Sequence, residues 1–179
     1  PSVSTHRKGN AVAKVKVGVI GCGNISGNYL HWAKSFDIIE VAALADMVPE
    51  RAIAKAAENG LRACSVEELL HDPEIQIVVN LTIPRAHAEV NLAALRAGKH
   101  AYCEKPFAVT RKQGERVLAT AARKGLLVGG APDTFLGGGI QTCRKLIDDG
   151  AIGTPGGATA FMAWCGHESW HPDPEFYYD

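Results

Sequence analysis

The sequence shows no excess of charge of either sign. Its 179 residues contain 19 Lys and Arg side chains and 19 Asp and Glu side chains. Proteins that bind nucleic acid or an anionic membrane surface concentrate basic residues in a patch or stripe. The balance of charge therefore argues against a nucleic-acid partner and against binding to an anionic membrane surface.

Long apolar segments are absent as well. No run approaches the roughly 18 apolar residues that a membrane-spanning helix requires. The first residues, PSVSTHRKGNAVAK, include basic side chains but lack the apolar core of a secretory signal. We therefore expect no membrane partner, and we expect residues 1–14 to form a flexible N-terminal arm.

Closely spaced cysteines are also missing. The five cysteines are odd in number, lie far apart and form no C-x-x-C pair. Disulfide frameworks and structural zinc sites use an even set or a short, regular spacing. We therefore expect reduced thiols, a cytoplasmic location and no metal site.

What the sequence does contain is a series of short apolar segments that alternate with helical patterns. Their length and content are typical of strands that are covered on both faces. The segments are residues 15–20, 39–45, 75–81, 100–103 and 126–130. Ser65 and Thr110 begin capping boxes, and Gly98 ends another helical pattern. The alternation predicts an α/β domain with a doubly wound parallel sheet over residues 15–133.

The pattern changes after about residue 132. We expect one more helix, which ends near Gly150, and then a strand over residues 158–164. The tail that follows is crowded with aromatic, His and Pro residues. We interpret residues 134–179 as the incomplete beginning of a second, α+β domain.

The segment Gly21-Cys22-Gly23-Asn24-Ile25-Ser26 follows the first predicted strand and matches G-x-G-x-x-G/A, with Ser in the third small position. The first glycine permits a tight turn, the second lets a pyrophosphate approach the backbone, and the third small residue lets the helix pack on the strand. The helix start offers N–H groups and a partial positive charge to the anion. Gly21, Gly23, Asn24, Ile25 and Ser26 are therefore candidate dinucleotide-binding residues.

Asp46 ends the second predicted strand, 20 residues beyond Ser26. An acid at this place accepts hydrogen bonds from the ribose hydroxyls of NAD and repels the 2′-phosphate of NADP. We therefore expect NAD, and we consider NADP the less favoured cofactor because only Arg51 nearby supports it. The alternative for Asp46 is a loop or helix-capping carboxylate.

A second group of motifs extends the pattern. It comprises Leu81-Thr82-Ile83-Pro84, His87, Ala97-Gly98-Lys99-His100, Glu104-Lys105-Pro106 and the segment from Lys145 to Gly153. With the glycine turn, these motifs span the chain after about residue 15, and the chain resembles the Gfo/Idh/MocA family of oxidoreductases. The resemblance implies a Rossmann domain followed by an α+β domain with an open, mostly antiparallel sheet, which serves substrate binding and oligomerisation.

The resemblance also implies roles for individual residues. Thr82, Ile83, Pro84 and His87 would line the cofactor near the nicotinamide-side ribose. Glu104 and Lys105 would stand at the edge where open α/β sheets bind ligands. Lys105 would contact both the ribose and the substrate hydroxyl, which makes it the candidate catalytic residue.

The chemistry of Lys105 agrees with that role, although simpler alternatives exist. Oxidation of an alcohol removes a hydride and a proton, and a lysine side chain can accept the proton or hold the hydroxyl. Lys105 would otherwise be a solvated surface lysine. Glu104 would be a rim carboxylate paired with a lysine, and His87 would be a structural histidine.

Four residues further along are candidate substrate contacts. Asp133 and Thr134 follow a predicted strand at the same edge as Lys105, and Trp164 and His167 would form a wall of the site. The alternative for Asp133 and Thr134 is a turn with a capping aspartate. The residues around His167 do not match H-E-x-x-H, so we expect no metal there.

These features predict an NAD-dependent dehydrogenase that transfers a hydride between NAD(H) and a secondary alcohol of a sugar, an inositol or a related polyol. Family members are longer, so we expect this chain to be truncated and poorly active alone, and the full-length protein to form homo-oligomers. The alternative is a non-catalytic NAD-binding sensor or regulatory module of the same fold.

Overall fold

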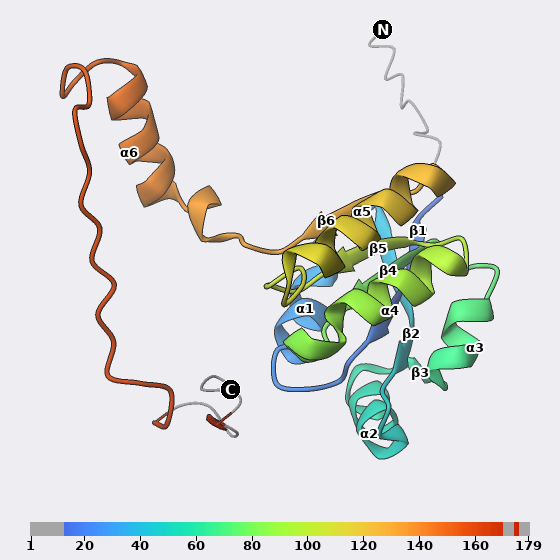
Figure 1. Ribbon diagram of the computed structural model, residues 1–179. Coiled ribbons are helices and arrows are strands. Elements are labelled where there is room, and N and C mark those ends of the chain that lie inside the picture. The colour runs from blue at the N-terminus through green and yellow to red at the C-terminus, as the bar shows by residue number, and fades with distance from the viewer. Residues whose placement is uncertain (1–12, 170–173, 176–179) are drawn as a thin grey trace, which may run out of the picture. The chain divides into compact units, whose positions relative to one another are not determined.

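The computed structural model of the protein describes residues 13–169 and 174–175 (Figure 1). Within them, six strands form one sheet: β1 (Val15–Ile20), β2 (Ile39–Ala45), β3 (Arg62–Ala63), β4 (Ile77–Asn80), β5 (His100–Cys103) and β6 (Val128–Gly130). The helices are α1 (Ser26–Ala33), α2 (Pro49–Asn59), α3 (Val66–His71), α4 (Pro84–Arg96), α5 (Arg111–Lys124), the 3-10 helix Thr134–Leu136 and α6 (Gly138–Asp148). The chain divides into two compact units, with the boundary in the sequence between Asp133 and Thr134.

The strand order in the sheet is β3-β2-β1-β4-β5-β6, and every neighbouring pair is parallel. The chain builds outward from β1 to β3 and then returns to the other side of β1 to add β4, β5 and β6. The order therefore reverses between β1 and β4, where open α/β sheets bind ligands. The predicted doubly wound parallel sheet is confirmed.

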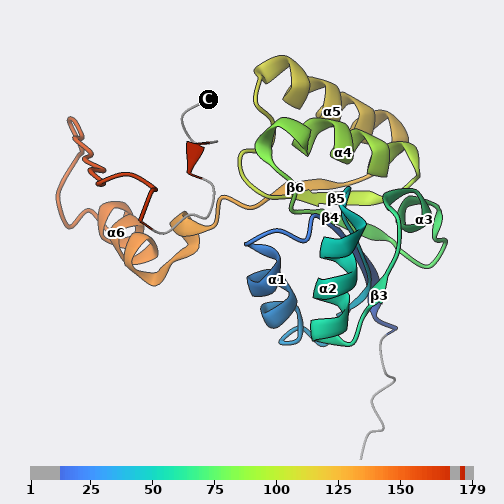
Figure 2. The same ribbon diagram turned by 90° about the horizontal axis from the view of Figure 1, so that it is seen from below.

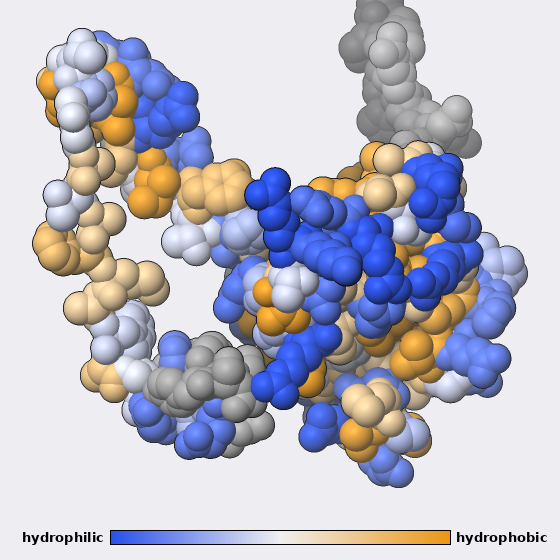
Figure 3. All heavy atoms as spheres, in the orientation of Figure 1, coloured by the Kyte–Doolittle hydropathy of each residue, from blue (hydrophilic) through white to orange (hydrophobic). Residues whose placement is uncertain are grey.

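Helices cover both faces of the sheet, with α1 and α2 on one side and α4 and α5 on the other (Figure 2). Successive strand residues point to opposite faces. Val19 packs in a cluster with Leu30 of α1. The next residue, Ile20, packs with Leu69 of α3 and Ala94 of α4. The outer faces of α4 and α5 carry hydrophilic side chains (Figure 3), so the core lies between sheet and helices.

Two helix starts that the capping boxes predicted are confirmed. Ser65 Oγ accepts a hydrogen bond of 3.1 Å from the backbone N–H of Glu68, whose carboxylate accepts one of 2.7 Å from Ser65 N. Thr110 and Gln113 form the same reciprocal pair at the start of α5. Because these bonds satisfy N–H groups that a helix start leaves unpaired, they fix where α3 and α5 begin.

Two features differ from the expectations. The sequence did not predict β3, which has only two residues, one of them the charged Arg62. The strand predicted over residues 158–164 is wrong, because the structure has no strand there and Phe161, Met162 and Trp164 are exposed. A strand needs hydrogen-bonded neighbours and a covered face, and none of the described segments pairs with these residues.

The second unit begins with the 3-10 helix and α6. The helix expected to end near Gly150 is α6, which ends at Asp148. Most of the predicted N-terminal arm, residues 1–12, lies outside the described residues, as do residues 170–173 and 176–179 of the tail. In the part of the chain that is described, no helix combines the length and the hydropathy needed to cross a bilayer.

Lys99 is buried in the first unit, with 5% of its surface exposed. Its Nζ donates to the carbonyl oxygens of Asp72 at 2.6 Å and Ile75 at 2.8 Å. Burial lowers the pKa of Lys99, and the charge of Asp72 acts in the opposite direction. The two bonds tie down the turn between α3 and β4, so this motif lysine has a structural role.

Replacement of Lys99 by Met tests this role, because Met keeps much of the apolar volume but donates no hydrogen bond. We expect the free energy of unfolding, measured by urea denaturation at neutral pH, to fall by about 1.5–3 kcal/mol. Lys112→Met, at an exposed position of α5, is the control and should change it by less than about 0.5 kcal/mol. Equal stability of the two variants would contradict the assignment.

Candidate functional site

The carboxyl ends of four strands meet at one edge of the sheet, and the turns after them form the candidate site. Backbone hydrogen bonds extend the parallel ladder one residue beyond the strands. The donor–acceptor pairs are Gly21 N with Ala45 O at 2.9 Å, Leu81 N with Ile20 O at 2.8 Å, and Glu104 N with Asn80 O at 2.9 Å. The turns after β1, β2, β4 and β5 are therefore held next to one another.

Gly21 makes the closest backbone approach at this edge. Its φ is +104°, and a Cβ at this position would lie 2.6 Å from the carbonyl C and O of Leu81 and 2.8 Å from Thr82 N. Only glycine fits here without strain, so the turns after β1 and β4 touch through their backbones. Ser26 is fully buried, and its Oγ donates to Gly23 O at 2.7 Å, which closes the glycine turn from inside.

The outer part of the glycine turn consists of Gly23, Asn24 and Ile25, all exposed. Among the described residues, their backbone N–H groups have no hydrogen-bond acceptor. Within the described part of the chain, no side chain caps α1, and a Cβ on Gly23 would meet no atom within 4 Å. The turn thus presents three unpaired donors and open space at the positive end of a helix, an arrangement that suits a phosphate.

Cys22 lies between the two glycines but points into the fold. It is buried, and its Sγ lies 3.6 Å from Ala45 O. Burial raises the pKa of the Cys22 thiol to about 11, and the charge of Asp46 acts in the same direction. Cys22 therefore stays protonated at neutral pH and acts as a packing residue beneath the turn.

Asp46 directly follows β2 and contacts the glycine turn. Its Oδ2 accepts from Cys22 N at 2.7 Å and its Oδ1 from Val48 N at 2.9 Å. The residue is thus a loop carboxylate and, at the same time, an anion beside the open turn. A hollow of about 550 Å³ adjoins it, with mostly apolar walls that include Ile53 and Cys64. Such walls suit a flat aromatic base.

A buried polar network connects the turn after β4 with the turn after β5. Asn80 Oδ1 accepts from Thr82 Oγ1 at 2.6 Å. The ring nitrogens of His87 lie 2.9 Å from Thr82 O and 2.6 Å from Pro106 O. A neutral ring donates to one of these carbonyls and a protonated ring to both.

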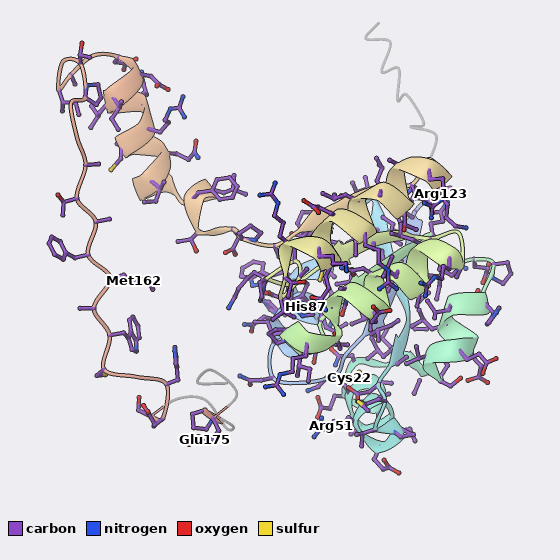
Figure 4. The ribbon with its side chains drawn as sticks, in the orientation of Figure 1. Cys22, Arg51, His87, Arg123, Met162 and Glu175 are labelled. Carbon is purple, nitrogen blue, oxygen red and sulfur yellow. The ribbon has the colours of Figure 1, made fainter. Side chains whose placement is uncertain are left out.

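This placement of His87 agrees with the structural alternative that the sequence left open. Only 1% of its surface is exposed, and it lies near the start of α4 (Figure 4), with its two ring nitrogens bonded to the two turns. Ile83 and Pro84 stand at the rim instead: Ile83 is exposed, and Pro84 is the first residue of α4. Thr82 is half-buried between His87 and the rim.

Glu104 and Lys105 occupy the turn after β5. Glu104 Oε2 accepts from the backbone N–H of Lys105 at 2.7 Å, so Glu104 orients the lysine through its backbone. The Lys105 side chain is exposed, and the described residues provide it with neither a hydrogen bond nor an ion pair. The Lys105–Pro106 peptide bond is cis. Because the Lys105 side chain is exposed and lacks a partner among the described residues, its ammonium is available to a ligand at the carboxyl edge.

Tyr29 belongs to the same cluster, although sequence reasoning did not select it. Its hydroxyl donates to Glu104 Oε1 at 2.9 Å from α1, 75 residues away in the sequence. Burial, together with the hydrogen bond to Glu104 and its charge, raises the pKa of Tyr29, so the hydroxyl remains a donor. No local pattern links residues so far apart, and only the fold brings them together.

The chain can now be compared with known proteins. A family model described as "Oxidoreductase family, NAD-binding Rossmann fold" matches residues 15–130. The chain belongs to the Gfo/Idh/MocA family. The matched residues contain all six strands of the sheet and both turns that touch at Gly21.

Similar proteins share this part of the chain. The inositol 2-dehydrogenase/D-chiro-inositol 3-dehydrogenase of Lactiplantibacillus plantarum is 36% identical over 146 residues, which are 78% of this chain and 41% of that protein. The WlbA dehydrogenase of Bordetella pertussis, solved with NADH and UDP-GlcNAcA, has a TM-score of 0.75 at 26% identity and covers 79% of this chain and 41% of its own. KijD10, a 3-ketoreductase of Actinomadura kijaniata solved with NADP and TDP-benzene, has a TM-score of 0.72 at 30% identity, with 76% and 43% covered. The chain spans about two fifths of the length of these similar proteins.

Of the four predicted substrate contacts, only Asp133 lies in the unit that carries the sheet. Asp133 lies three residues beyond the end of β6. Burial raises the pKa of Tyr29 and Tyr102, and the charge of Asp133 acts in the same direction. Thr134, Trp164 and His167 lie in the second unit. Substrate contact by all four residues stays a prediction. Across the described residues, no three His, Cys, Asp or Glu side chains gather as metal ligands.

Two alanine substitutions distinguish the glycines of the turn. Gly21→Ala should lower the free energy of unfolding by about 3 kcal/mol, because its Cβ would overlap the backbone of Leu81 at a left-handed φ. Gly23→Ala should change it by less than about 0.5 kcal/mol, because the Cβ enters open space. Denaturation of both variants in urea makes the comparison, and similar losses would refute the described contact.

Proposed function

We propose that this chain is the cofactor-binding part of an NAD-dependent dehydrogenase that transfers a hydride between NAD(H) and a secondary alcohol of a sugar, an inositol or a related polyol. The observation that carries the proposal is the row of N–H groups on Gly23, Asn24 and Ile25, which no described residue accepts from and which lie beside the Asp46 carboxylate. Membership of an oxidoreductase family supports it. Because the chain spans about two fifths of its relatives' length, the activity is proposed for the whole protein.

The residues at the carboxyl edge fit a dinucleotide. The N–H groups of Gly23, Asn24 and Ile25 would hold the diphosphate, and the hollow beside Asp46 would take the adenine. Each oxygen of Asp46 keeps a lone pair after its bond to a backbone N–H, so the carboxylate can accept from the ribose hydroxyls. Its charge would repel a 2′-phosphate, which favours NAD over NADP.

Lys105 is the residue that we assign to proton transfer. NAD⁺, when bound, supplies the hydride acceptor, C4 of its nicotinamide. Oxidation of a secondary alcohol to a ketone also releases the hydroxyl proton, which the neutral amine of Lys105 would accept and which its ammonium would return in the reverse reaction. Glu104 would accept a hydrogen bond from the nicotinamide-side ribose through a remaining lone pair.

The substrate class rests on the relatives. The Lactiplantibacillus plantarum protein is named for inositol oxidation, and WlbA was solved with the sugar nucleotide UDP-GlcNAcA. Inositol and UDP-GlcNAcA both carry several hydroxyl groups. The exposed ammonium of Lys105 has three N–H donors, which can bind the oxygen atoms of such a substrate.

A titration with NADH tests the cofactor assignment. We expect the 179-residue chain to enhance NADH fluorescence on binding and to bind NADPH about tenfold more weakly, because Asp46 repels the 2′-phosphate. Asp46→Asn should weaken NADH binding about tenfold and reduce the preference for NADH. Glu50→Gln, an exposed acid in the first turn of α2, is the matched control. Equal affinities of Asp46→Asn and Glu50→Gln for NADH would contradict the assignment.

Turnover is tested on the whole protein. A screen of inositols and sugars for NADH production should find a substrate, and Lys105→Met should lower kcat while NADH binding stays within about twofold. Binding of NADH without turnover of any polyol would support the alternative, a non-catalytic NAD-binding sensor.

A further inference from the structure

We propose that Tyr29 is a positioning residue that couples the diphosphate-binding helix to the turn of Glu104 and Lys105. The inference rests on the proposed function, because it concerns how the two halves of the cofactor site are held in register. It assigns to α1 a second role, in which the helix that starts at the glycine turn also sets the carboxylate at the nicotinamide side.

The connection runs through two hydrogen bonds to one carboxylate. Tyr29 Oη donates to Glu104 Oε1 at 2.9 Å, and Lys105 N donates to Glu104 Oε2 at 2.7 Å. A glutamate at the end of a strand samples several rotamers unless donors fix both oxygens. With both oxygens held, the Glu104 side chain has one orientation, and the Lys105 backbone is set relative to α1.

Tyr29 is itself held in place. Its half-buried ring packs against the cluster that contains Val19, Leu30 and Leu44, so the hydroxyl projects from the core toward the carboxyl edge. Burial and the neighbouring carboxylate raise the pKa of Tyr29, and the hydroxyl therefore donates throughout the neutral range. The bond is charge-assisted, which makes it stronger than a bond between neutral groups.

The bound carboxylate retains acceptor capacity. Each oxygen of Glu104 has accepted one hydrogen bond and can accept another. A ribose diol at the nicotinamide side of the dinucleotide would find these acceptors already oriented, so less side-chain freedom is lost on binding. Loss of the Tyr29 hydroxyl should therefore weaken the binding of a ligand that reaches Glu104 and leave unchanged the binding of a ligand that reaches only the glycine turn.

The test compares two ligands and two tyrosines. NADH reaches both ends of the proposed site, whereas ADP reaches only the glycine turn and Asp46. Tyr29→Phe should raise the dissociation constant of NADH about fivefold and change that of ADP by less than about twofold. Tyr102→Phe is the matched control, because Tyr102 lies at the same edge and its hydroxyl bonds to no described residue. It should leave both ligands unaffected.

A second measurement needs no ligand. In the free chain, the Lys105 amide hydrogen is bonded to Glu104, so Tyr29→Phe should raise its exchange rate in NMR about tenfold, and Tyr102→Phe should not. If Tyr29→Phe fails to fold, the test uses Glu104→Ala instead, with the ¹³Cζ resonance of Tyr29 as the signal. Glu104→Ala should shift this resonance and leave the ¹³Cζ resonance of Tyr102 in place.

The outcomes separate the two proposals. A wild-type chain that binds no NADH overturns the proposed function, whereas the exchange of the Lys105 amide still decides the role of Tyr29. Unchanged NADH affinity and unchanged amide exchange in Tyr29→Phe overturn the positioning role. Equal weakening of NADH and ADP also overturns it, because it would show that Tyr29 only supports the packing of α1.

Discussion

The contact between the backbones of Gly21 and Leu81 is the constraint on which the site depends. The strand order reverses between β1 and β4, where open α/β sheets bind ligands, and the turns that leave these two strands touch there. The two turns can approach so closely because a hydrogen atom occupies the place where any other residue would put a Cβ 2.6 Å from the Leu81 carbonyl. The unpaired N–H groups of the glycine turn are thereby held beside the turn that leads to Thr82 and His87.

Hydrogen bonds of polar side chains connect the turns at that contact with the turn that contains Lys105. On one side, His87 lies between Thr82 O and Pro106 O. On the other, Tyr29 and the Lys105 amide hold the two oxygens of Glu104. The backbone around Lys105 is thus supported from α4 and from α1, while its ammonium stays exposed. Buried polar groups are costly unless they are bonded, so these contacts fix the turn in one arrangement.

Local features of the sequence predicted much of this structure. Alternation of apolar segments and capping boxes predicted the parallel sheet and the starts of α3 and α5, because those signals act over a few residues. The spacing of Gly21, Gly23 and Ser26 predicted the open turn for the same reason. Asp46 was found by its distance from the turn, although its bond to Cys22 N was not.

The features that sequence reasoning missed depend on contacts between distant residues. Tyr29 and Glu104 carry no shared pattern, and although the sequence selected His87, its contact with Pro106 O depends on a residue 19 positions away. β3 is too short for a periodic signal. Residues 158–164 have the composition of a strand, but composition does not supply a hydrogen-bonded neighbour, and among the described residues there is none.

The most direct measurement is the NMR spectrum of the ¹⁵N-labelled chain during a titration with NADH. The account predicts that the amide protons of Gly23, Asn24 and Ile25 shift downfield as they bind the diphosphate, because no described residue of the free chain accepts a hydrogen bond from them. The account is contradicted if NADH binds without shifting these three resonances and shifts only resonances of residues that lie far from the carboxyl edge.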